Sequence, residues 1–178
     1  MNKTLLLLAV LTLSAAAAST LPDASAQARA RGRAVAYHGP EGAGAGRMFA
    51  AHGDRGSVAR GGRVHGDGHG NVDGHRRVYA QGARGGTAQR HESFHRNADG
   101  SAGRQYSASI DAARGGAMDS SGSLARDADG HVSGSRATSV SGRNGATYTG
   151  ATSVANGTLT HTHTCANAAG EPVACRRN

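Results

Sequence analysis

Residues 133–164 read SGSRATSVSGRNGATYTGATSVANGTLTHTHT, and this stretch decides the fold. Two turn signals, Asn144-Gly145 and Asn156-Gly157, separate three runs that are rich in Ser, Thr and Val. Asn and Gly adopt positive φ at low cost, so such pairs reverse the chain between two strands. Residues 158–164 alternate Thr with Leu or His, which is the period of a strand. The stretch therefore predicts consecutive β-hairpins.

Similar turn signals recur upstream with a period of 30 residues, which indicates an internal repeat. Asp99-Gly100 and Asp129-Gly130 belong to one series of turns, and a second series of glycines lies between them. The positions that keep the period are Gly70, Gly100 and Gly130; Gly85, Gly115 and Gly145; and Ser93, Ser123 and Ser153, each Ser followed by Phe94, Leu124 or Val154. Each unit carries two turns, so we expect two strands per unit and an antiparallel meander. A β-solenoid with one coil per unit and a largely disordered chain are the alternatives.

The composition predicts that this mostly β fold has little hydrophobic core. From Gln27 onward, only 14 of 152 residues are Val, Leu, Ile or Phe, and the chain has no Trp. Such a low apolar fraction is typical of disordered chains, and it cannot fill a two-layer core at normal density. The expected structure is a thin sheet held mainly by hydrogen bonds between strands and by small side chains.

The N-terminus carries the pattern of a secretory signal peptide over residues 1–26. Asn2 and Lys3 precede an apolar run at residues 5–18, and small residues follow at Ala24-Ser25-Ala26. A basic start, a short apolar run and an Ala-x-Ala site are the three parts of such a peptide. We therefore expect export to the periplasm or beyond the cell. No later segment is apolar enough to span a bilayer as a helix, so no transmembrane segment is expected after cleavage.

The rest of the chain divides into three predicted parts. Residues 27–64 contain Gly-Ala-Gly-Ala-Gly and scattered Arg with little alternation, which predicts a flexible, disordered leader or poorly ordered strands. Residues 65–164 hold the hairpin repeat. Residues 165–178 form a C-terminal loop and tail, in which Cys165 and Cys175 are the only cysteines of the chain. In an oxidising compartment these two cysteines are expected to form a disulfide.

The turn Gly142-Arg143-Asn144-Gly145 and its flanking strands resemble a loose group of proteins exported by Gram-negative bacteria. In that group, repeated Gly-x-Asn-Gly turns separate strands rich in Ser, Thr and Arg. The resemblance covers about residues 95–165 and implies repeated β-hairpins, but it implies no activity and no catalytic residues. The chain departs from the group in its Arg-Gly-Gly turns at residues 84–86 and 114–116, and in the His-rich stretch at residues 65–95.

The basic charge of the chain suggests anionic partners. Its net charge is +8, and every basic residue after Lys3 is Arg. Arginine holds phosphate and carboxylate groups with two parallel hydrogen bonds, so anionic envelope polymers are candidate partners, as are other copies of the chain. A solvated surface kept soluble by its charge is the plainer interpretation. Arg-Gly-Gly pieces are typical of RNA-binding tails, but predicted export and few aromatic residues argue against specific nucleic-acid recognition.

Histidine supplies the one candidate metal site that the sequence predicts. His161 and His163 point to the same face of the strand expected at residues 158–164, so their rings have the placement to share Zn²⁺, Cu²⁺ or Ni²⁺. Surface histidines without a metal are the plainer interpretation. The segment Asp67–Gly74 resembles a calcium-binding loop, but Val72 replaces the required Gly, so an Asx turn opening a hairpin is favoured.

The sequence predicts neither an enzyme nor a cofactor. No Gly-x-Ser-x-Gly motif opens a helix, and the few apolar residues cannot enclose a large pocket. We therefore expect a non-enzymatic cell-envelope or extracellular repeat protein that acts by surface display, polyanion contact or self-association. A periplasmic metal-binding protein that uses histidine is the alternative.

Overall fold

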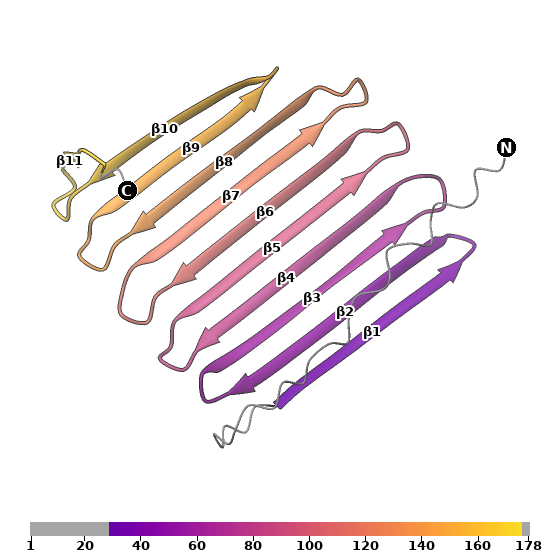
Figure 1. The fold of residues 1–178 in the computed structure, drawn as a ribbon, viewed down its shortest axis with the longest axis horizontal. Coiled ribbons are helices and arrows are strands. Elements are labelled where there is room, and N and C mark those ends of the chain that lie inside the picture. Colours follow the sequence, from indigo (N-terminus) through magenta and orange to yellow (C-terminus); the bar gives the residue numbers. More distant parts are fainter. Residues whose placement is uncertain (1–28, 176–178) are drawn as a thin grey trace, which may run out of the picture.

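The computed structural model describes residues 29–175, which form a single open sheet of eleven strands in one layer (Figure 1). The strands are β1 (Arg29–Gly39), β2 (Gly42–Gly53), β3 (Gly56–Gly66), β4 (Val72–Gly82), β5 (Thr87–Arg96), β6 (Ala102–Asp111), β7 (Ala117–Arg126), β8 (Val132–Ser141), β9 (Thr147–Ala155), β10 (Thr158–Ala166) and β11 (Pro172–Val173). The described residues contain no helix, and hence none long and apolar enough to cross a membrane. The predicted signal peptide at residues 1–26 and the end of the tail at residues 176–178 lie outside the described part of the chain.

Each strand pairs with its sequence neighbours, and every pair is antiparallel. Figure 1 shows the strands lying side by side in chain order, from β1 at one edge to β10 and the short β11 at the other. The predicted antiparallel meander of hairpins is therefore confirmed. A β-solenoid is excluded, since its strands would pair in parallel with the next coil and not antiparallel with the next strand.

The expectation of a flexible leader at residues 27–64 is wrong for the described residues from 29 onward. Strands β1, β2 and most of β3 occupy this segment and pair in the same way as the later strands. Backbone groups alone make the hydrogen bonds between strands, so the lack of regular alternation does not prevent pairing. Gly44 also lets the Tyr37 ring of β1 lie over β2, since a Cβ atom on Gly44 would stand 2.6 Å from that ring.

The 30-residue repeat corresponds to one pair of strands with its two turns. The paired residues place Ser93, Ser123 and Ser153 in one row that crosses the sheet, separated by Gln105 and Ser135 on the strands between. Phe94, Leu124 and Val154 lie in the adjacent row, on the opposite face. Every repeat therefore places equivalent side chains in the same row, two strands apart.

The residues expected in turns lie between strands. Asp99-Gly100, Asp129-Gly130 and Asn144-Gly145 connect β5 to β6, β7 to β8 and β8 to β9, and each of these glycines has a positive φ of 81° to 92°. In the first of these turns, the Gly100 N–H donates to the Asn97 carbonyl over 3.0 Å. Asn156 and Gly157 have φ of 51° and 77° and join β9 directly to β10, which is the geometry of a two-residue hairpin turn.

The sheet encloses no core. No hydrophobic residue is buried among residues 29–175, and Ser120 is the one buried polar side chain there. Large apolar side chains such as Leu124 and Leu159 remain 51% and 70% exposed. Both faces of the sheet are thus open, and any contact with another molecule occurs at a face or at an edge.

Candidate functional site

The two faces of the sheet differ sharply in chemistry. Side chains alternate between the faces along each strand, and paired residues lie on the same face, so the register assigns every strand residue to one of them. We call the apolar face the one that carries Phe94, Leu124 and Val154. Of the Val, Leu, Ile, Met, Phe and Tyr residues in β1–β10, all but four lie on it. The exceptions, on the polar face, are Val35, Tyr37, Met48 and Tyr79.

Two apolar rows cross this face, one toward each end of the strands. The first consists of Ala30, Ala51, Val58, Ala80, Ala88, Ile110, Met118, Val140, Tyr148 and Cys165. The second consists of Ala36, Ala45, Val64, Gly74, Phe94, Arg104, Leu124, Gly134, Val154 and Leu159. The first row has no polar member apart from the disulfide-bonded Cys165, and the second has only Arg104. The two rows are not contiguous, since the rows between them hold most of the charged side chains of this face over β2–β5 and mostly Ser, Thr, Gly and His over β7–β10.

A cluster of arginines lies on the apolar face over β2–β6, and we call it the arginine cluster. Its members are Arg47, Arg60, Arg76, Arg90 and Arg104. Glu92 is the only acidic side chain on this face of β1–β10, and it pairs with Arg104 and, over 3.4 Å, with Arg90. The Glu92 side chain is only 17% exposed, whereas the two arginines are 50% and 54% exposed. The cluster therefore retains a clear excess of exposed positive charge.

Aromatic rings hold two arginines of the cluster in place. The Arg60 guanidinium lies 4.8 Å from the centre of the Phe49 ring, and that of Arg90 lies 5.8 Å from the Tyr106 ring. A guanidinium over an aromatic face is attracted by the ring while its N–H groups remain available at its edge. These arginines are thus oriented within an apolar surface and still able to bind an anion.

The polar face is divided between a basic half and a hydroxyl-rich half. Over β1–β5 it carries Arg31, Arg33, Arg63 and Arg77. The pKa of His75 is lowered, first by partial burial and then by the charges of Arg63 and Arg77. Over β6–β10 this face carries small side chains, mostly Ser, Thr and Ala. A shallow hollow of about 1980 Å³ runs over the middle of the strands on this face and is open to solvent.

The predicted metal ligands His161 and His163 lie together on the apolar face of β10. Their ring centres are 5.4 Å apart. The Nδ1 atom of His161 lies 2.8 Å from the Thr152 hydroxyl, and the His163 ring stacks on Tyr148 at 6.4 Å. The structure therefore brings the two rings close, as the strand period predicted. Within the described residues, no Asp, Glu or Cys side chain lies close enough to the two rings to complete a group of three metal ligands.

A second group with metal-ligand spacing is the exposed turn between β7 and β8. One ligand atom each of Asp127, Asp129 and His131 lie within 4.8 Å of one another. Asp127 already accepts a hydrogen bond from the His131 backbone N–H at 2.8 Å, and its other oxygen lies 3.1 Å from the His131 ring. The Asx-x-Asp-Gly signal identified this turn from the sequence, but His131 follows the motif and was not expected to join it. The contacts present are those of an internally bonded hairpin turn.

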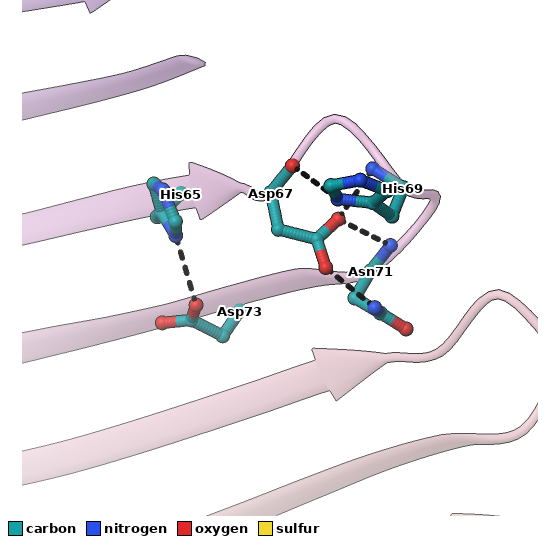
Figure 2. A network of polar contacts seen from close by, with 5 residues as sticks. All are labelled: His65, Asp67, His69, Asn71 and Asp73. Atoms are coloured by element: carbon teal, nitrogen blue, oxygen red, sulfur yellow. Dashed lines mark hydrogen bonds and ion pairs between the residues drawn. The ribbon is translucent and has the colours of Figure 1, made fainter. Parts of the chain in front are cut away.

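The corresponding turn between β3 and β4 is also closed by an Asp side chain, but its residues do not form a group with metal-ligand spacing (Figure 2). The Asp67 carboxylate accepts hydrogen bonds from the backbone N–H groups of His69 and Asn71 at 2.7 and 3.1 Å, and from the Asn71 side chain at 2.5 Å. These bonds lower the pKa of Asp67. His65 and Asp73 lie apart from this loop and contact each other at 3.5 Å. The carboxylate thus closes the turn, as expected for an Asx turn.

The C-terminal end of the sheet is closed by a disulfide. Cys165 of β10 is bonded to Cys175, with a Cα–Cα distance of 5.4 Å. Between them the chain turns at residues 167–171 and returns as β11, which pairs with the last two residues of β10. The disulfide therefore fixes a short hairpin against one end of the edge strand.

Comparison with known proteins does not extend these observations. No protein family model matches the chain, and no curated protein or solved structure matches it either. The faces, edges and turns of the sheet are therefore the basis for assigning a function.

The sequence did not reveal the sorting of the apolar side chains or the arginine cluster. Arg60, Arg90 and Arg104 are far apart in sequence, and each looks like an isolated charge there. They share a face because every turn between neighbouring strands preserves the alternation. The signal that identifies them is the position of each residue within its strand, counted from the turn glycines.

Proposed function

We propose that the protein is an exported, non-enzymatic repeat protein of the cell envelope or extracellular space that acts by surface contact. The observation that carries the proposal is the absence of any buried hydrophobic residue in residues 29–175, combined with two chemically distinct open faces. A protein of this form has its binding capacity on its faces and edges. The N-terminal apolar run and the Cys165–Cys175 disulfide support export.

Anionic polymers of the envelope and other copies of the chain are the proposed partners. The net charge of +8 is carried by exposed arginines on both faces, which suits phosphate and carboxylate groups. For self-contact, the strand edges are the relevant feature. Strand β1 has no outer neighbour among the described residues, and β11 pairs only with Cys165 and Ala166 of β10. The open backbone of both edges is suited to pairing with another chain.

Sedimentation over a concentration series tests self-association through these edges. We expect association that weakens in the double variant Ala34→Lys/Ala36→Lys, since added lysines on β1 discourage edge pairing. The matched control is Ala125→Lys/Ala137→Lys, which adds the same charge at exposed positions of interior strands. Binding of a soluble polyanion such as dextran sulfate is measured in parallel. A protein that stays monomeric and binds no polyanion or anionic surface would contradict the proposal.

Metal binding is a second candidate function, favoured by the 5.4 Å distance between the His161 and His163 rings. Two histidines on one strand face can supply two of the ligands of Zn²⁺ or Cu²⁺, with water completing the coordination. Calorimetric titration with each metal tests this proposal, with the double variant His161→Ala/His163→Ala as the comparison. Binding no tighter than that of the double variant would remove it.

A further inference from the structure

We infer that the apolar face lies on an anionic lipid surface, with the arginine cluster at the level of the lipid phosphates. This inference rests on the proposed function and names the partner and the face. It depends on three features of the described residues, namely the two apolar rows, the arginines between and beside them, and the scarcity of acidic groups on the same face.

The apolar rows supply the attraction to lipid. Exposed side chains of these rows include Phe94 (41%), Ile110 (46%), Leu124 (51%) and Leu159 (70%). They occur on β5, β6, β7 and β10, so the exposed apolar surface extends over half of the sheet. An amphipathic surface of this kind gains free energy by placing its apolar side at the boundary between headgroups and acyl chains.

The arginine cluster selects for negative charge in the partner. Six arginines, the five of the cluster and Arg96, and one glutamate lie on this face over β2–β6, and Glu92 is already paired with Arg90 and Arg104. Basic residues near a membrane are attracted by anionic headgroups, and a guanidinium holds a phosphate with two hydrogen bonds. The contacts of Arg60 with Phe49 and of Arg90 with Tyr106 keep the charges within the apolar surface. A lipid phosphate joined to acyl chains matches both parts of the face.

The same cluster argues against a second copy as the partner of this face. Two apolar faces packed together would bury two arginine clusters with only one Glu92 each, and unpaired buried charges are costly. A soluble polyanion would neutralise the arginines but leave Leu124 and Leu159 in water. The polar face, whose Arg31, Arg33, Arg63 and Arg77 are not flanked by apolar rows, is the better surface for such a polymer.

Vesicle co-sedimentation tests the inference. The purified protein is mixed with vesicles of phosphatidylcholine alone and with vesicles containing phosphatidylglycerol. We expect binding to the anionic vesicles, reduced by salt, and little binding to phosphatidylcholine. The variant Leu124→Asp/Leu159→Asp is expected to bind at least about tenfold more weakly, because it removes two apolar contacts and adds two negative charges. Both leucines are largely exposed, so the variant is expected to fold.

The matched control places the same charges on the same strands but on the polar face. The control variant is Ser123→Asp/Thr160→Asp. Ser123 directly precedes Leu124 on β7, and Thr160 directly follows Leu159 on β10. We expect vesicle binding to change less than about twofold in this control, since its carboxylates face away from the membrane. A second pair of variants compares three arginines removed from each face, Arg47→Gln/Arg60→Gln/Arg76→Gln against Arg33→Gln/Arg63→Gln/Arg77→Gln. The first triple is expected to lower binding more.

Each result bears on the inference. Equal effects of the two aspartate variants, or no binding to anionic vesicles, would overturn it. Binding of dextran sulfate without binding of vesicles would overturn the lipid assignment and leave the proposed function in place. Loss of vesicle binding in the apolar-face variant alone, with dextran sulfate binding retained, would support both.

Discussion

At single positions, large side chains of one strand lie over glycines of a neighbouring strand. A Cβ atom built on Gly74 would stand 2.5 Å from the Phe94 ring, and one on Gly122 would stand 2.7 Å from the Tyr106 ring. Both glycines are thus kept free of side chains so that an aromatic ring can cover the backbone. In a sheet without a second layer, these contacts replace part of the packing that a core would supply.

Substitution of Gly122 tests this role. A methyl group there would also meet the Ser135 carbonyl oxygen at 2.7 Å, so Gly122→Ala forces the ring and the backbone apart. We expect a loss of roughly 1–3 kcal/mol in the free energy of unfolding, measured by urea denaturation. Gly46→Ala is the control, since its nearest neighbours stand at 3.5 and 3.7 Å and leave room for the methyl. Equal stability of the two variants would show that ring coverage of Gly122 is unimportant.

Carboxylates in the turns make the stability of single turns depend on pH. The Asp99 carboxylate accepts hydrogen bonds from the Ser101 hydroxyl and backbone N–H at 2.7 and 2.8 Å, and these bonds lower its pKa from 3.8. The folded state therefore favours the charged form. This stabilisation is present above pH 3.8 and is lost as the pH falls through the lower folded-state pKa.

Titration of Asp99 by NMR is the direct measurement. We expect a midpoint below 3.8 in the unaltered protein and a midpoint closer to 3.8 in Ser101→Ala, which removes the hydroxyl donor but keeps the backbone donor. The amides of the turn between β5 and β6 should show lower protection factors against exchange below that midpoint. An unchanged midpoint in Ser101→Ala would contradict the assigned cause.

Among the elements, the strands with clear turn signals were the ones that the sequence predicted well. Strands β8, β9 and β10 follow from Asn144-Gly145, Asn156-Gly157 and the alternation of Thr. Strands β1, β2 and most of β3 lie where the sequence favoured a flexible leader and offered poorly ordered strands only as the alternative, because their side chains show little alternation and their pairing depends on backbone hydrogen bonds with neighbours. The assignment of side chains to the two faces also required the strand register, since the sequence alone does not show which residues are paired.

The C-terminal hairpin of β10 and β11 is the element most dependent on a covalent bond. Only Cys165 and Ala166 pair with β11, and one backbone hydrogen bond of 2.9 Å joins Asn167 to Glu171. We expect Cys165→Ser/Cys175→Ser to destabilise this hairpin locally by about 2–3 kcal/mol. Limited proteolysis should then cleave residues 167–175 faster, while circular dichroism of the sheet stays nearly unchanged. Cooperative loss of the whole sheet would contradict a local role, and a reducing agent should have no effect on the double variant.

At the scale of the whole molecule, each strand contacts only its immediate neighbours, so the sheet is built as a linear array. In such arrays, stability is approximately a sum of the terms of single units and of their interfaces. A pair of strands with its two turns is one unit of 30 residues, and its removal leaves equivalent neighbours to pair. Because 30 is an even number, removal of one unit leaves the apolar side chains of the remaining strands on the same face.

Deletion of residues 97–126 tests this architecture. It joins β5 to the turn at residues 127–131, so Arg96 pairs with Val132 in place of Ala102 and the apolar side chains stay on one face. We expect a folded sheet with unchanged circular dichroism per residue, shorter by about 10 Å across the strands in solution scattering, since two strand spacings are lost.

Deletion of residues 97–111 is the control, since it removes one strand and its turn, an odd number of residues. Ala117 then takes the place of Ala102 opposite Arg96, and Met118 and Leu124 move to the polar face. The control is expected to lose the sorted faces and its binding to anionic vesicles, whereas equal behaviour of the two deletions would contradict a sheet organised by alternating positions.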